Sequence, residues 1–151
     1  MISNIIKTDI LEVKDKTEKF VAIRIGGQLF ALSAIAVEDV LMPQKITPVP
    51  LAPDAIVGLF NLRGRIVTAI DLRVKMGMEP GSRTGKSIVV SYQDNLYGFI
   101  VDEVTGVYDV TLSEIEHNPE NLSEKWKEYC LGIYKTETEL MVILNIEGLF
   151  K

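Results

Sequence analysis

Short runs of strand-forming residues, separated by turn residues at close spacing, constrain the fold of this chain more than any other feature. Residues 20–25 and 28–32 are two such runs, and Gly26-Gly27 between them is suited to a two-residue hairpin turn. The same pattern recurs along the 151 residues, with no long helical period. It predicts an all-β fold, mostly β with short helices, built as one or two small β-barrels.

Residues 58–73 form the most informative single segment. Two apolar runs flank a polar corner, which predicts a β-hairpin whose reversal Gly64 permits. Arg63 should therefore be displayed at the corner, where a planar guanidinium suits recognition of a carboxylate or carbonyl group on a partner. The alternative is a solvated turn arginine without a binding role.

Turn residues and composition divide the chain into segments. Pro80, Gly81 and Gly85 mark the best candidate for a linker, and the strand pattern restarts after it. Charged residues interrupt the apolar ones near the amino terminus, which favours a mobile tail. We predict a flexible tail over residues 1–19, a first barrel over about 20–77, a linker over about 78–86, a second barrel over about 87–145 and a closing helix over 146–150.

Charge and composition argue against several classes of partner. The 21 acidic residues outnumber the 16 basic ones and give a net charge of -5, which argues against direct binding to nucleic acid or to an anionic membrane. The longest apolar runs fall far short of the ~20 residues that cross a bilayer. Cys130 is the only cysteine, so no internal disulfide can form, and we expect a cytoplasmic protein.

The residues that catalysis or metal binding would need are missing from the sequence. Residues 81–87 resemble a phosphate-binding loop, but three residues separate the two glycines where the pattern requires four, and a strand should follow rather than a helix. His117 is the only histidine, and no partner stands at metal-ligand spacing. Asp71 and Asp102 follow strand runs, as capping or solvated carboxylates do. We expect no catalytic residue, no metal site and no cofactor.

Several segments, taken in order, resemble the CheW family, the coupling proteins of bacterial chemotaxis. The resemblance runs from about Phe20 to Phe150, and its most specific pieces are residues 20–26, 57–73, 98–104, 128–129 and 140–147. It implies one CheW-like domain over 20–151, with two five-stranded, Src-homology-3-like β-barrels packed around a shared apolar seam. It also implies a non-enzymatic adaptor that couples the cytoplasmic tip of methyl-accepting chemoreceptors to the regulatory domain of the histidine kinase CheA.

The resemblance assigns two binding surfaces residue by residue. An apolar groove with a charged rim would take the side of a receptor helix. Its residues would be Val37, Asp39, Val40, Arg63, Val104 and Val107. The kinase contact would use the edge of the first barrel at Ile46 and Val49. Membrane association would then be indirect, through the receptors.

Two other functions fit part of the pattern. An adaptor of a related CheW-like array, one that controls twitching motility or biofilm formation, would share the same features. An oligonucleotide-binding barrel would have a similar strand count, but its groove should be basic and lined by stacked aromatic rings. The chain is acidic and only 7% aromatic, which disfavours that reading.

Overall fold

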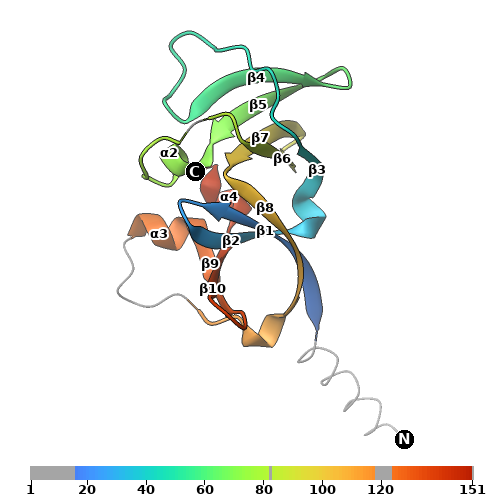
Figure 1. Cartoon of the computed structure of the whole chain (residues 1–151), viewed down its shortest axis with the longest axis vertical. Coiled ribbons are helices and arrows are strands. Elements are labelled where there is room, and N and C mark those ends of the chain that lie inside the picture. Colours follow the sequence, from blue (N-terminus) through green and yellow to red (C-terminus); the bar gives the residue numbers. More distant parts are fainter. Residues whose placement is uncertain (1–15, 82, 118–123, 151) are drawn as a thin grey trace, which may run out of the picture.

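Ten strands in two five-stranded sheets form the framework of the protein (Figure 1). The computed structural model describes residues 16–81, 83–117 and 124–150, and the predicted all-β class with short helices is confirmed. In chain order the elements are β1 (Thr17–Ile25), β2 (Gln28–Ser33), η1 (Ala34–Ala36), β3 (Val37–Leu41), β4 (Ile56–Leu62), β5 (Arg65–Asp71), α2 (Leu72–Lys75), β6 (Lys86–Tyr92), β7 (Asn95–Val101), β8 (Glu103–Thr111), η2 (Leu112–Glu114), α3 (Glu124–Tyr129), β9 (Cys130–Lys135), β10 (Leu140–Leu144) and α4 (Ile146–Leu149).

Two-residue turns join three of the strand pairs, as turn residues in the sequence indicate. These turns connect β1 with β2, β4 with β5, and β6 with β7. All six turn residues have positive φ, the geometry that matches the right-handed twist of the flanking strands. The turn residues are Gly26-Gly27, Arg63-Gly64 and Gln93-Asp94.

The described chain starts almost directly with a strand. Of the predicted tail, residues 1–15 lie outside the described residues, and β1 begins at Thr17 rather than at residue 20. Thr17 and Glu18 pair with Thr111 and Val110 of β8. This partner strand lies far away in the sequence, so local residue patterns give no sign of the longer strand.

Both halves of the chain contribute to both sheets. Sheet A has the strand order β8-β1-β2-β10-β9, and sheet B has the order β3-β6-β7-β5-β4. The first half thus places two strands in sheet A and three in sheet B, and the second half does the reverse. The predicted barrel boundaries, 20–77 and 87–145, separate the two halves of the chain but do not separate the two sheets.

Parallel strand pairs account for this difference from the sequence prediction. β10 lies parallel to β2 in sheet A, and β5 lies parallel to β7 in sheet B. A parallel pair requires a long connection between its strands. Local residue patterns reveal hairpins, but they do not specify which distant strand completes a sheet.

Three apolar clusters form the core. One cluster lies within sheet A, around Phe20 and Met141, and a second lies within sheet B, around Phe60 and Leu96. The third, called the seam here, lies between the sheets and is built from residues of both. Its members include Val21, Ile23 and Phe30 from sheet A and Ile88, Val90 and Phe99 from sheet B. Each sheet therefore packs around its own cluster and shares the seam with the other.

Candidate functional site

A bulge in β3 turns two of the predicted receptor-binding residues toward the same face. Val37 pairs with Val90, and Val40 pairs with Ile88. Glu38 is the extra residue at the bulge, because the register shifts between Val37 and the next paired residue. Paired residues share a face of the sheet, and both partners in β6 belong to the seam. Val37 and Val40 therefore share the seam face, whereas an unbroken strand would place them on opposite faces.

β8 repeats this arrangement in sheet A. Val104 pairs with Ile23, and Val107 pairs with Val21, both members of the seam. Thr105 is the extra residue here, since the register shifts between the two pairs. The predicted valines of β8 therefore also lie on the seam face, three residues apart as in β3.

These four valines define what we call the seam surface: Val37, Val40, Val104 and Val107. Val37 and Val104 are half-buried and pack against the seam. Val40 and Val107 are 42% and 61% exposed. The seam surface thus combines two anchored valines with two that are available for an apolar partner.

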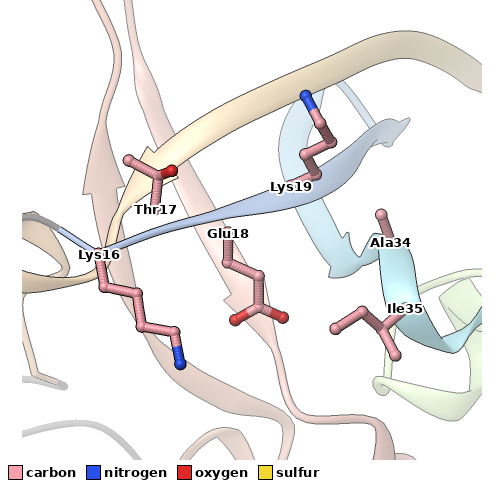
Figure 2. A pocket seen from close by; sticks show the side chains of 6 residues that line it. All are labelled: Lys16, Thr17, Glu18, Lys19, Ala34 and Ile35. Carbon is pink, nitrogen blue, oxygen red and sulfur yellow. The ribbon is translucent and has the colours of Figure 1, made fainter. Parts of the chain in front are cut away.

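A pocket of about 460 Å³ lies where the start of β1 meets η1 (Figure 2). Ile35 lines this pocket and is 88% exposed. Figure 2 shows that the Glu18 carboxylate also lines the pocket. Ile35 is not among the residues predicted from the sequence, because an isoleucine beside a strand is usually buried. η1 leads directly into Val37, so this exposed apolar side chain lies two residues before the seam surface in the chain.

Asp39 and Arg63 form an ion pair that lies apart from the four valines. Asp39 pairs with Val89, a member of the sheet B cluster, so it faces away from the seam. Its carboxylate accepts hydrogen bonds from Arg63 Nη2 at 3.2 Å and from the Val40 amide at 2.8 Å. The Arg63 side chain is 81% exposed, against 26% for Asp39. Arg63 is thus displayed at the hairpin corner and tied to β3 by the aspartate.

The predicted kinase-binding residues lie beside β4, at the other edge of sheet B. Thr47 and Leu59 exchange two backbone hydrogen bonds of 2.8 Å, which fix the segment along β4. Ile46 is half-buried against the sheet B cluster, and Val49 is 39% exposed. Leu51, which is not among the predicted residues, is fully exposed in the same segment. The two predicted surfaces therefore start from different edge strands, β3 and β4.

The described residues offer little for catalysis or metal binding. Among residues 16–81, 83–117 and 124–150, no group of three or more His, Cys, Asp or Glu side chains could hold a metal ion. The Cys130 thiol is buried, and this burial raises its pKa and disfavours the reactive thiolate. Residues 81–87 lead into β6 rather than into a helix, so they lack the helix N-terminus that a phosphate-binding loop uses.

No helix in the described part of the chain has both the length and the apolar character needed to span a membrane.

Comparison with known proteins identifies the family. The family model described as CheW-like domain matches residues 19–151. Chemotaxis protein CheW of Helicobacter pylori is 30% identical, over 93% of this chain and 86% of that protein. Chemotaxis protein CheW of Bacillus subtilis is 33% identical, over 85% and 83%. The crystal structure of the scaffolding protein TtCheW from Thermoanaerobacter tengcongensis superposes with a TM-score of 0.80 at 29% identity, covering 89% of this chain and 88% of that one. The chain therefore belongs to the CheW family of non-enzymatic chemotaxis scaffold proteins.

Proposed function

We propose that this protein couples methyl-accepting chemoreceptors to the histidine kinase CheA in the cytoplasm by binding both at once. The observation that carries this proposal is the pair of bulges in β3 and β8. Each bulge turns two valines three residues apart toward the seam face. Because the same arrangement occurs once in each sheet, it supports a shared binding role for the four valines.

The receptor would dock on the seam surface through the side of a helix. A docked helix gains free energy mainly by removing apolar area from water, and Val40 and Val107 offer such area. Ile35 enlarges this apolar area beside β3. Arg63 supplies charge at a separate position, where Asp39 holds it, and its exposed guanidinium would set the register of the helix.

The kinase regulatory domain would dock on the segment beside β4, through Ile46 and Val49. The exchange of hydrogen bonds between Thr47 and Leu59 gives this segment a fixed backbone, which lowers the entropy cost of binding. Because the two surfaces start from different edge strands of sheet B, one molecule could hold both partners.

The proposal is tested by sedimenting receptor-bearing membranes with purified CheA, with and without this protein. The protein should increase the amount of CheA in the pellet. Val40→Lys and Val107→Lys should each weaken capture of the protein by receptor membranes by at least ~1 kcal/mol, the threshold for a residue that matters at an interface. Both side chains are exposed, so the variants should fold.

Leu131→Lys is the matched control, because Leu131 of β9 is 55% exposed but lies outside the seam surface. It should leave receptor capture unchanged. Normal capture of both valine variants would remove the receptor assignment from the seam surface. A wild-type protein that leaves CheA in the supernatant, despite its own capture by the membranes, would contradict the coupling function.

A further inference from the structure

The glycine-containing run at residues 81–87 resembles a phosphate-binding loop in sequence, but its contacts indicate a structural role. It belongs to the connection between the two halves of the chain, and its last two residues are the first two of β6. A Cβ atom on Gly85 would lie 2.2 Å from the carbonyl oxygen of Val101, so the run packs tightly against the end of β7. Arg83, in the middle of the run, directs its side chain toward the protein.

Arg83 meets a buried carboxylate. Asp71, at the end of β5, is 2% exposed and is one of only two buried polar residues among those described. Its carboxylate accepts a hydrogen bond from the Arg73 amide at 3.0 Å, which caps α2, and a second from Arg83 Nε at 3.0 Å. A buried carboxylate is costly without a cation and hydrogen-bond donors, so Arg83 has a strong partner here.

The same guanidinium reaches a second group. Arg83 Nη2 donates a hydrogen bond to the Asp54 carbonyl oxygen at 2.9 Å. The backbone of Arg83 has φ +59, a conformation that residues other than glycine rarely adopt. The strained backbone persists because the side chain bridges Asp71 and Asp54.

Asp54 stands at the end of the segment that presents the predicted kinase-binding residues. The segment is held at its start by the two bonds between Thr47 and Leu59. At its end, the Asp71 amide donates to the Ala55 carbonyl at 2.7 Å, next to the bond from Arg83. Val49 and Leu51 lie between these two anchor points.

We propose that Arg83 is a positioning residue for the kinase-binding segment: it uses the buried Asp71 carboxylate as a fixed base and holds residues 48–54 in their docking conformation. This inference rests on the proposed function for the identity of the partner. Only a forked cation can make both contacts with this geometry. A lysine would carry the same charge, but its ammonium group lacks the second arm that reaches the Asp54 carbonyl.

Four variants separate this role from a general loss of stability. Arg83→Lys keeps the charge, and Arg83→Ala removes both contacts. Asp54→Ala is the matched control, because Asp54 contributes only its backbone carbonyl to the contact and the variant retains that group. Asp71→Asn keeps an oxygen to cap α2 while weakening the attraction for Arg83, and it serves if Arg83→Ala does not fold.

Three measurements are made on each variant in the full chain. Hydrogen exchange at the Ile56 amide, which donates from the start of β4 to the Pro53 carbonyl in the segment, reports how firmly the segment is held. Pull-down with the purified CheA regulatory domain reports kinase binding, and co-sedimentation with receptor membranes reports the seam surface. Arg83→Ala and Arg83→Lys should accelerate exchange at Ile56 and weaken kinase binding at least about fivefold, with receptor capture unchanged. Asp54→Ala should match the wild type in all three measurements.

Unchanged exchange at Ile56 in both Arg83 variants, or faster exchange with normal kinase binding, would overturn the inference and leave the proposed function standing. Equal weakening of kinase and receptor binding would also overturn it, because that result indicates a general structural effect. Failure of the wild-type protein to bind the kinase domain would contradict the proposed function, and the exchange rates would then decide on their own whether Arg83 holds the segment.

Discussion

In each sheet an extended segment closes one edge strand by crossing over a glycine. In sheet B, Thr47 pairs with Leu59, and a Cβ on Gly58 would lie 2.2 Å from the Thr47 carbonyl oxygen. In sheet A, Glu116 pairs with Ile133, and a Cβ on the preceding Gly132 would lie 2.5 Å from the Glu116 carbonyl oxygen. Both edges thus require a residue without a side chain, because a neighbouring backbone occupies that space.

The same correspondence continues at the ends of β5 and β10. The Asp71 amide donates to the Ala55 carbonyl at 2.7 Å, and the Asn145 amide donates to the Tyr129 carbonyl at 2.8 Å. Each residue also stands before a short helix, α2 or α4. The two sheets therefore share a backbone plan down to single hydrogen bonds.

The sheets differ in the side chains that secure this plan. Asp71 is charged and buried, and Arg83 pairs with it. Asn145 is neutral, and its side chain makes no capping hydrogen bond to α4. At the end of α3 an aromatic contact takes the place of the ion pair. The ring centroids of Trp126 and Tyr129 lie 6.3 Å apart in an edge-to-face arrangement. The backbone plan thus sets the fold, and the side chains added to it decide what each edge can present to a partner.

The largest expected effect tests whether the seam depends equally on the two sheets. Phe30 of β2 and Phe99 of β7 are both 0% exposed members of the seam. Phe30→Ala and Phe99→Ala should each reduce the free energy of unfolding by about 3–5 kcal/mol, since each leaves a large cavity. Urea unfolding measures the loss, and Ile66→Ala, at an exposed position, should change it by less than about 0.5 kcal/mol. A loss below about 1 kcal/mol at either phenylalanine would show that the seam is one-sided.

The next effect tests the glycines under the two edge segments. Gly58→Ala and Gly132→Ala should each cost about 1–3 kcal/mol, because the new methyl group displaces a neighbouring backbone. Hydrogen exchange should become faster at the Leu59 amide in the first variant and at the Ile133 amide in the second, since these amides donate across the crossing. Each variant serves as the control for the other. Destabilisation in only one of them would break the correspondence between the edges.

A pH experiment sharpens the contrast between the ion pairs that hold the two hairpin corners. In sheet A, Arg24 binds Glu139 through two hydrogen bonds of 2.9 and 2.6 Å. Hydrogen bonding from Arg24, assisted by its positive charge, lowers the pKa of Glu139 below its ordinary value. A lowered folded-state pKa stabilises the protein above the ordinary glutamate pKa of about 4.3, and this contribution is lost as the pH falls through the folded-state value. The Tm of the wild type should therefore fall further between neutral and acidic pH than the Tm of Glu139→Gln. Parallel Tm curves for the two proteins would contradict this role of Glu139.

The smallest effect on stability is expected at the corresponding corner of sheet B. Arg63→Ala removes a single hydrogen bond to Asp39 from a side chain that is 81% exposed. Such a pair contributes about 0–1 kcal/mol, so urea unfolding should change little. Receptor capture should nevertheless weaken if Arg63 sets the register of the receptor helix. A stability loss above about 2 kcal/mol would instead assign Arg63 a structural role.

Local features of the fold were accessible from the sequence, and the long-range ones were not. The Gly26-Gly27 turn and the Arg63-Gly64 corner are confirmed, because turn residues between apolar runs encode hairpins locally. The exchange of strands between the halves was missed, because it depends on pairing across most of the chain.

The candidate site shows the same division. A resemblance to the CheW family named the four valines, but the sequence pattern could not show that bulges at Glu38 and Thr105 bring them to one face. Alternation along an unbroken strand would have separated each pair. Asp71 was expected to be a cap or a solvated carboxylate, and it does cap α2, but its burial under Arg83 depends on a contact that no spacing rule predicts.

The exchange of strands between the two halves also determines when the chain can fold during its synthesis. Sheet B is complete only when β7 of the second half has been synthesised, and sheet A only when β10 has been, since β10 lies between β2 and β9. A nascent chain that has emerged only as far as residue 81 would expose the unpaired edge of β2 and the apolar surface meant for the seam, a state in which strands aggregate readily. The two halves must therefore fold as one cooperative unit, and a protease cut between them would yield no working fragment.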